Sequence, residues 1–349
     1  MTADQNSDGE QTEHKRRLRY RGTHPRSFVE KYKELNADKY AADVAHIMSR
    51  GQTPAGTHRP ICVKEILEVL NPKDGETGLD ATLGWGGHTR ELAMKILPTG
   101  RLFAIDVDPI ELPKTEARLR GFGLTDANLI IRRINFAGIS QIVNEAGTLF
   151  DFVLADLGVS SMQIDTPSRG FTYKADGPLD LRLNPNKGLS AAALIRKLSA
   201  DELAEILADY SDEPESVRIA SAIVANASSI DTTRQLAAAI TDAVPRMVDS
   251  QKRKTLQRVF QALRIAVNDE FAVLEQFLTL LPYCVKPQAR IAILTFHSGE
   301  DRRVKKSFQE GFRSGIYSDW SREPIRPSAE EQRENPRSSC AKLRWAIKA

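Results

Sequence analysis

Short apolar runs alternate with helical segments throughout residues 77–156. The runs are bounded by turn residues, and apolar residues recur at helical spacing between them. Strand–helix units of this length predict a parallel, doubly wound sheet with helices on both faces. The predicted strands of the whole chain are "TGLDATL", "RLFAIDVD", "NLIIRRI", "DFVLADLGV", "ARIAILTF" and "AKLRWAIK".

The alternation stops near Gln163, and the sequence from there to residue 281 is mostly helical in its spacing. We therefore predict an α/β protein whose Rossmann-like core, residues 58–164 and 265–349, is interrupted by a helical insertion at residues 165–264. The insertion carries no chemical signature, and its position favours a lid or an RNA platform over the core. A homodimer surface is the competing interpretation.

Residues 1–57 form a separate amino-terminal part, which begins with a polar tail and continues with residues at helical spacing. The tail is too poor in apolar residues to fold alone. Its segment "HKRRLRYRGTHPR" gathers basic residues around Tyr20, a composition suited to nucleic-acid phosphates and one stacked base. A merely solvated tail is an equally good interpretation.

Composition excludes several classes of protein. No apolar run approaches the ~20 residues of a membrane span, and the amino terminus lacks the apolar region of a secretory signal. The cysteines Cys62, Cys284 and Cys340 are scattered without the spacing of a zinc site or a disulfide framework. We therefore expect a cytoplasmic protein with no membrane association and no metal. The net charge of +3 means that any contact with RNA depends on local basic patches.

A glycine-rich stretch, "DATLGWGGHT", follows the first predicted strand. In a doubly wound sheet, ligands bind at the carboxyl ends of the strands, where Gly84, Gly86 and Gly87 would form a turn before a helix. Asp106 ends the next strand, where a carboxylate can bind a ribose. The turn continues with His88 and lacks the further spaced glycine of a dinucleotide fold, so the pattern favours S-adenosylmethionine. A purely structural turn is the alternative.

A further acidic residue, Asp156, ends "DFVLADLGV" at the same edge of the predicted sheet. Many methyltransferases that act on exocyclic amines keep an acidic or amide residue at this position. The lone pair of such an amine is delocalised into the ring, so a nearby acceptor that takes the proton assists the transfer. We predict Asp156 as the catalytic residue. An aspartate that only caps the next turn is the alternative.

Successive blocks of the chain resemble the signatures of the RsmH/MraW family, in the order of that family and from about His58 to the carboxyl end. The resemblance implies a class I methyltransferase that uses S-adenosylmethionine to methylate N4 of a cytosine in the decoding region of bacterial 16S ribosomal RNA. Its partner would be small-subunit ribosomal RNA or the assembled small subunit. The blocks are "DATLGWGGHT", "AIDVDP", "NF" at 135–136, "DLGVSSMQIDTPSRGFTYKADGPLDLRL", "FQALRIAVNDE", "TFHSGEDRRVKK" and "NPRSSCAKLR".

The same resemblance implies which residues contact S-adenosylmethionine. Phe136 would pack against the adenine, and Asp106 would hold the ribose. Asp156 and Gln163 would lie near the methionine part, beside the reacting centre. Together with Gly84 from the glycine turn, the predicted cofactor residues are Gly84, Gly86, Gly87, His88, Asp106, Phe136, Asp156 and Gln163.

The stretch "SRGFTYKADGPLDLR" combines cationic, aromatic and acidic residues. A target base in folded RNA is splayed out and stacked on an aromatic ring, and a loop of this composition suits that task. A self-bonded surface loop is the alternative from the residues alone, and the resemblance favours substrate binding. For His297, which follows "ARIAILTF", a structural role is as good an interpretation as substrate binding. The predicted substrate residues are Arg169, Phe171, Asp176, Asp180, Arg182 and His297.

Some features depart from the family pattern: the first sixty or so residues, the basic run at 252–254, and Gly299 where an apolar residue is expected. They leave open the same chemistry on a different RNA. A nucleotide-dependent oxidoreductase and a non-catalytic RNA-binding assembly factor are more remote alternatives. The basic run, with Arg302, Lys305 and Lys306, offers candidate phosphate contacts, although solvated helix surfaces have the same composition.

Overall fold

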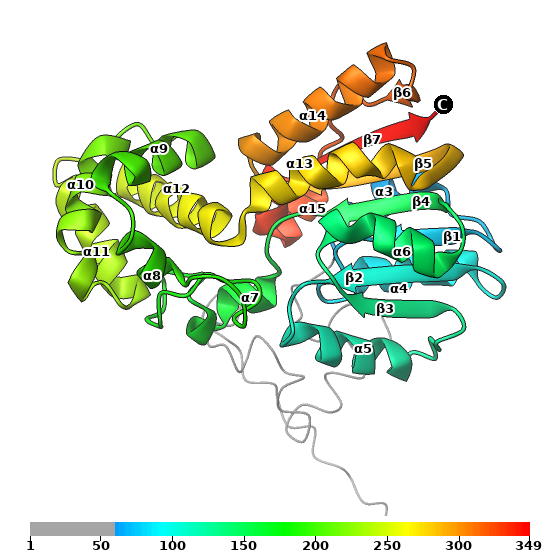
Figure 1. Ribbon diagram of the computed structural model, residues 1–349, viewed down its shortest axis with the longest axis horizontal. Coiled ribbons are helices and arrows are strands. Elements are labelled where there is room, and N and C mark those ends of the chain that lie inside the picture. The colour runs from blue at the N-terminus through cyan, green and yellow to red at the C-terminus, as the bar shows by residue number, and fades with distance from the viewer. Residues whose placement is uncertain (1–59) are drawn as a thin grey trace, which may run out of the picture. The chain divides into compact units, whose positions relative to one another are not determined.

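The computed structural model describes residues 60–349, so the features predicted for residues 1–57, including the basic tail, lie outside the described part. A seven-stranded sheet of order β3-β2-β1-β4-β5-β7-β6 runs through this part (Figure 1). β1 to β5 are parallel, and β7 is antiparallel to both β5 and β6. The strands are β1 (Thr77–Asp80), β2 (Arg101–Asp106), β3 (Leu129–Arg133), β4 (Phe150–Asp156), β5 (Val285–Thr295), β6 (Tyr317–Trp320) and β7 (Lys342–Lys348).

This sheet confirms the predicted Rossmann-like α/β fold. The chain places β2 and β3 on one side of β1 and then crosses to β4 on the other side. The strand order therefore reverses between β1 and β4, and ligands of such folds bind beside the carboxyl ends of the strands at this point.

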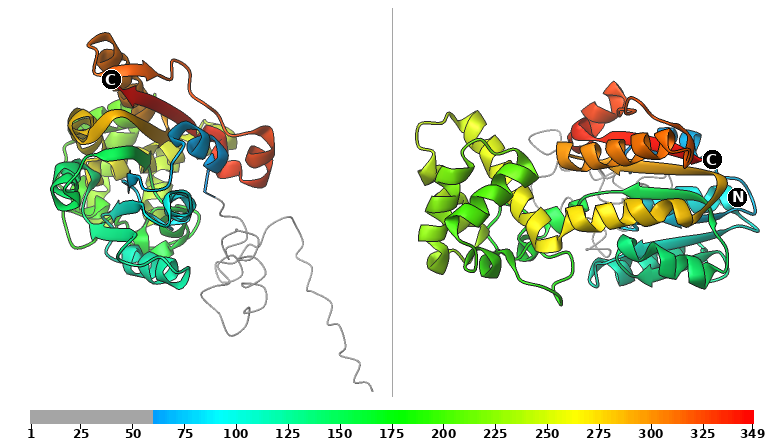
Figure 2. Two further views of the ribbon diagram at one scale, coloured as in Figure 1. Left: turned by 90° about the vertical axis from the view of Figure 1, so that its right-hand side faces the viewer. Right: turned by 45° about the horizontal axis from the view of Figure 1, so that its top comes forward.

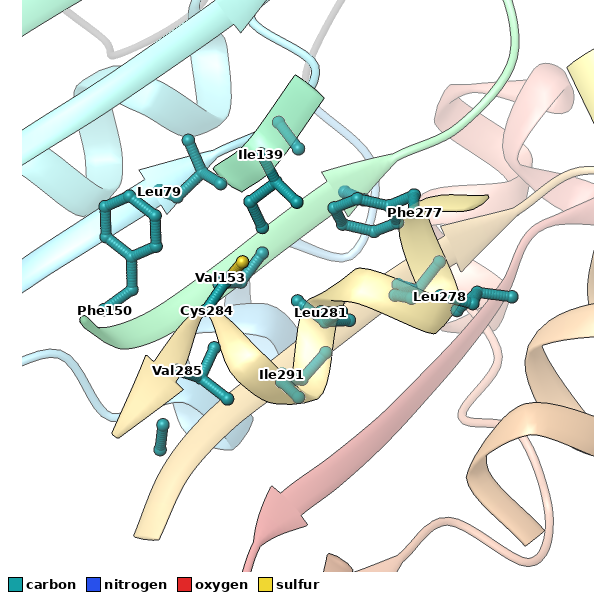
Figure 3. Packing of buried hydrophobic residues seen from close by; sticks show 14 of the residues in the cluster. Leu79, Ile139, Phe150, Val153, Phe277, Leu278, Leu281, Cys284, Val285 and Ile291 are labelled. Carbon is teal, nitrogen blue, oxygen red and sulfur yellow. The ribbon is translucent and has the colours of Figure 1, made fainter. Parts of the chain in front are cut away.

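Helices cover both faces of the sheet. They are α3 (Val63–Leu70), α4 (Gly87–Ile96), α5 (Glu111–Gly121), α6 (Ile139–Ala146), α13 (Glu270–Leu280) and α14 (Ser298–Arg313). Successive side chains of a strand point to opposite faces. Val153 thus joins the hydrophobic cluster under α6, α13 and α14, part of which Figure 3 shows, whereas Phe152 and Leu154 join the cluster under α3, α4 and α5. Two short helices, α7 (Ser161–Asp165) and α15 (Ala329–Glu334), contribute no residue to these clusters.

The segment between β4 and β5 contains a helical group with a hydrophobic cluster of its own. Its helices are α8 (Ala191–Ile195), α9 (Ala200–Ser211), α10 (Ser216–Ala225), α11 (Thr233–Ala243) and α12 (Asp249–Asn268). Ser199 and Thr232 form capping boxes that fix the starts of α9 and α11. Figure 1 and the right-hand view of Figure 2 show this group beyond the carboxyl ends of the parallel strands, with α12 leading into α13. No helix within residues 60–349 is both long enough and apolar enough to span a membrane.

Candidate active site

Aspartates end three neighbouring parallel strands on one edge of the sheet. Asp80, Asp106 and Asp156 are the last residues of β1, β2 and β4, and β1 pairs with both of the other strands. The glycine turn and α4 follow Asp80 at this edge. An edge lined by carboxylates favours a positively charged ligand.

Asp80 holds the glycine turn in place. It is 1% exposed; its Oδ1 accepts a hydrogen bond from the Thr82 backbone N–H at 3.0 Å, and its Oδ2 accepts one from Thr89 Oγ1 at 2.6 Å. Burial raises the pKa of this carboxyl group, although the bonds from Thr89 and Thr82 oppose the rise. Because both oxygens are engaged within the turn, Asp80 supports the turn itself, a role that the sequence pattern did not indicate.

Asp106 stands beside the turn with room for further hydrogen bonds. Its Oδ2 accepts a bond from the Gly84 backbone N–H at 2.8 Å, and its Oδ1 accepts one from the Asp108 backbone N–H at 2.9 Å. Burial raises the pKa of Asp106, and these backbone contacts oppose the rise. Each carboxylate oxygen has a second acceptor position. Asp106 can therefore also accept hydrogen bonds from ribose hydroxyls.

The glycines of the turn have distinct roles. Gly86 has a φ of +82°, and a Cβ at this position would lie 2.9 Å from Thr115 Cγ2 on α5. A Cβ on Gly87 would lie 2.5 Å from Pro60 Cγ, so only glycine packs here between α5 and the residues before α3. Gly84 has a φ of +48°, and among the described residues outside its chain neighbours an added Cβ would meet only the Thr82 backbone oxygen, at an uncrowded 3.8 Å. A ligand can thus approach the backbone beside Asp106.

His88, which is buried, and Asp156, which is half-buried, form a pair across this edge. His88 lies in the first turn of α4, and its Nε2 is 3.5 Å from Asp156 Oδ2. Burial lowers the pKa of His88, but Asp156, Asp80 and Glu331 together raise it more, so the pKa lies above its ordinary value. Neither His88 Nε2 nor Asp156 Oδ1 makes a hydrogen bond within residues 60–349. Buried polar atoms without partners mark a position that a ligand can satisfy.

Asp108, which sequence reasoning did not single out, connects Gln163 to the ligand edge. It is 1% exposed, and its Oδ2 accepts hydrogen bonds from Gln163 Nε2 at 2.7 Å and from Arg169 Nη1 at 2.8 Å. Its Oδ1 accepts backbone N–H groups at the start of α5. An aspartate just before a predicted helix is a capping signal that could have identified it. Gln163 and Arg169 are therefore held together next to the predicted cofactor residues.

Phe136 follows β3 in a one-turn 3₁₀ helix, Phe136–Gly138. Asn135 caps this turn by accepting a hydrogen bond from the Ala137 backbone N–H at 3.0 Å. The Phe136 ring is half-buried and packs edge-to-face against Phe277 of α13, with 5.2 Å between the ring centroids. Its contact with an adenine stays a prediction.

The other predicted substrate residues are spread over separate contacts. Arg182 binds Asp180 through hydrogen bonds of 2.8 and 2.7 Å, the arrangement expected of a self-bonded loop. Burial raises the pKa of Asp180, but Arg182 lowers it more, so the pKa lies below its ordinary value. Asp176 accepts a hydrogen bond from the Arg234 backbone N–H in the first turn of α11, and Phe171 is buried in the cluster of the helical group. Their contacts with RNA stay predictions.

His297 precedes α14 and belongs to a buried charged group. Its Nδ1 accepts a hydrogen bond from the Glu300 backbone N–H at 3.4 Å, and its Nε2 lies 3.0 Å from Glu300 Oε1. Burial raises the pKa of Glu300, but His297 and Arg264 lower it more, so the pKa lies below its ordinary value. Glu270, His297 and Glu300 are close enough to hold a metal ion, but Arg264 already binds both oxygens of Glu270 at 2.8 Å. This geometry favours a structural role for His297.

A model of the MraW methylase family matches residues 55–349. The chain belongs to this family. It is 54% identical, over 98% of its length and 100% of the relative, to ribosomal RNA small subunit methyltransferase H 2 of Alkaliphilus metalliredigens. It is 53% identical to ribosomal RNA small subunit methyltransferase H 1 of Lachnoclostridium phytofermentans, over 99% of this chain and 96% of the relative. Ribosomal RNA small subunit methyltransferase H of Acidobacterium capsulatum is 39% identical, over 83% of this chain and 98% of the relative.

Solved structures resemble this MraW-family chain only distantly. An rRNA methylase from Streptococcus thermophilus matches with a TM-score of 0.38 and 12% identity, over 82% of this chain and 93% of that chain. A SAM-dependent O-methyltransferase from Thermotoga maritima matches with a TM-score of 0.40 and 12% identity, over 88% of this chain and 71% of that chain. The family assignment therefore rests on the sequence relatives.

Family membership confirms the resemblance and identifies S-adenosylmethionine as the methyl donor. The site fits this ligand, because its carboxylates suit a positively charged sulfur and amino group. Asp156 Oδ1 is unpartnered within residues 60–349, and in the same range a Cβ added to Gly84 would meet no atom closer than 3.8 Å. The amino-terminal part is shared with some relatives, since the alignments to the A. metalliredigens and L. phytofermentans proteins cover 98% and 99% of this chain.

Proposed function

We propose that this chain transfers the methyl group of S-adenosylmethionine to the N4 amine of a cytosine in the decoding region of small-subunit (16S) ribosomal RNA. The names of the relatives support small-subunit rRNA as the substrate. The observation that carries the chemistry is Asp156 Oδ1, a buried acceptor without a partner among residues 60–349. Such an acceptor suits an amine, whose N–H group is bound and whose proton is removed during the transfer.

Residues of this chain bind S-adenosylmethionine, orient the target amine and accept its proton. When bound, S-adenosylmethionine supplies a methyl group on a positively charged sulfur, so that a C–N bond forms while the S–C bond breaks and sulfur keeps the electron pair. Asp106 and the backbone at Gly84 hold the nucleoside part of this ligand. Asp156 accepts the hydrogen bond of the N4 amine and then its proton. Fixed alignment of the two reactants supplies much of the remaining acceleration.

Basic residues on α12 and α14 support RNA binding. Arg253, Lys254, Lys305 and Lys306 are exposed, and Lys252 is half-buried. We infer that they contact phosphates, which orients the RNA on the protein without reading its sequence. The cytosine itself is then selected by the residues at the sheet edge and by the structure of the rRNA.

The test of this function is methyl transfer to small ribosomal subunits that lack the modification. Purified protein, subunits and labelled S-adenosylmethionine are incubated, and the RNA is digested for nucleoside mass analysis and mapping. We expect N4-methylcytidine in the decoding region. If the protein binds S-adenosylmethionine but the subunits stay unlabelled, the proposed substrate is wrong, and labelling of naked 16S rRNA or of other RNAs becomes the next measurement.

Asp106→Ala is expected to weaken binding of S-adenosylmethionine at least tenfold, about 1.4 kcal/mol or more. The substitution removes the ribose acceptor and also frees the Gly84 and Asp108 backbone N–H groups that Asp106 binds. Isothermal titration calorimetry measures the dissociation constant. Asp126→Ala is the matched control, because Asp126 is an exposed partner of Arg120. Equal dissociation constants for wild type and Asp106→Ala would remove Asp106 from the cofactor site.

A further inference from the structure

We propose that His88 is a positioning residue for the methyl-transfer step: as a cation, its imidazole attracts one oxygen of Asp156 and leaves the other oxygen to accept a hydrogen bond from the target amine. This inference rests on the proposed function. The resemblance had placed His88 only among the residues that contact the cofactor. The structure also places its side chain beside Asp156, with Nε2 3.5 Å from Oδ2.

The aspartates of the sheet edge differ in how their oxygens are engaged. Both oxygens of Asp80 accept hydrogen bonds from the turn, and both oxygens of Asp106 accept backbone N–H groups. Asp156 has Oδ2 beside His88, while its buried Oδ1 has no partner within residues 60–349. Asp156 is therefore the aspartate of this edge with a fully free oxygen, and His88 is the side chain that determines which oxygen is free.

The backbone around the pair is rigidly held, so the pair itself has a defined geometry. The backbone N–H of Asp156 donates to Thr82 Oγ1 at 2.6 Å, and Asp80 binds both Thr82 and Thr89. His88 precedes Thr89 in the first turn of α4 and has a side chain that is only 8% exposed. The same hydrogen-bonded turn thus positions both members of the pair.

The charges around His88 favour an imidazolium ring. Asp156 faces it from β4, Asp80 from β1 and Glu331 from α15, and all of these raise its pKa against the effect of burial. Cys62, before α3, lies in the same region and donates its backbone N–H to Glu331 Oε1 at 2.9 Å. The first turn of a helix disfavours a cation. Carboxylates are therefore what makes a charged His88 stable at this position, and a charged ring binds Asp156 more strongly than a neutral one.

A double-mutant cycle tests the proposal. His88→Gln, Asp156→Asn and the double variant are compared for kcat with unmodified small subunits and for binding of S-adenosylmethionine. We expect His88→Gln to lower kcat about tenfold in the wild-type background and less than about twofold in the Asp156→Asn background, because His88 acts through Asp156. The same fold-loss in both backgrounds would overturn the proposal, since a merely structural loss is additive. Absence of activity in the wild type would instead contradict the proposed function.

A second readout does not depend on activity. A raised pKa of His88 in the folded state stabilises the fold fully below the unfolded pKa of about 6.5, and this stabilisation is lost as pH rises through the folded pKa. The difference in denaturation midpoint between wild type and His88→Gln is thus expected to shrink as pH rises above about 6.5. It is expected to shrink less in the Asp156→Asn background, where only Asp80 and Glu331 still raise the pKa of His88.

The control for this measurement is Lys95→Gln, an exposed charge removal in the last turn of the same helix. Its difference from wild type should show no such dependence on Asp156. A pH-independent difference between wild type and His88→Gln would show that His88 is not paired as a cation, and the proposal would fall even if His88→Gln were inactive.

Discussion

Asp156→Asn is expected to lower kcat at least 100-fold and to change the dissociation constant of S-adenosylmethionine less than about threefold. Asparagine keeps an oxygen that accepts a hydrogen bond, so ligands that only bind to Asp156 lose little. It cannot take up a proton as a carboxylate does. General acid–base groups contribute about 10²- to 10⁴-fold to the rates of enzymes, and the expected loss lies within that range.

Single-turnover methylation of unmodified small subunits measures this loss, with calorimetry for the cofactor. Asp151→Asn is the matched control, because Asp151 lies at the opposite end of β4, where its carboxylate binds Lys286 and the Thr77 backbone N–H. This control is expected to keep its turnover. Parallel losses of turnover and cofactor affinity in Asp156→Asn would make Asp156 a cofactor ligand and not the proton acceptor.

The core of the fold could be predicted because its strands are buried on both faces. Continuous apolar runs such as "DFVLADLGV" indicate buried strands when helical segments separate them. β1 to β5 and β7 lie where these runs predict strands. β6, with four residues at the edge of the sheet, was not predicted. Only two of its residues are buried, so its apolar signal is too short to stand out from the turns around it.

The site could be predicted only where backbone position alone decides it. β1, β2 and β4 each end at an aspartate, so the backbone alone places these residues at one edge, whichever way their side chains point. The partner of Arg182 is the nearby Asp180, as the self-bonded alternative expected. The partner of Arg169 is Asp108, which is distant in sequence, so no local pattern encodes it. Gly299 is a similar case, because a Cβ there would lie 2.5 Å from Phe271, a contact between segments that are distant in sequence. Its departure from the family pattern thus has a packing reason.

Arg169→Met is expected to destabilise the fold by about 3–5 kcal/mol, because it leaves the Asp108 carboxylate buried without its cationic partner. The Arg169 and Asp108 side chains are 7% and 1% exposed, and they are joined at 2.8 Å. Arg169 also donates to the backbone oxygens of Arg182 and Leu183. Its loss therefore removes the link between the ligand edge and the segment that leads into the helical group.

Urea denaturation followed by circular dichroism measures this change. Arg182→Met is the matched control on the same segment, because the Arg182–Asp180 pair is 22% and 23% exposed, so that water can reach Asp180 when Arg182 is removed and the expected loss is smaller than for Arg169→Met. Adding Asp108→Asn to Arg169→Met removes the buried charge and should recover a large part of the loss, since the penalty comes from an unpaired ion and not from a missing contact. Equal effects of Arg169→Met and Arg182→Met would mean that solvent reaches Asp108.

Binding of S-adenosylmethionine should also weaken more in Arg169→Met than in Arg182→Met. Gln163 shares Asp108 with Arg169, and it loses a fixed partner when that carboxylate moves toward solvent.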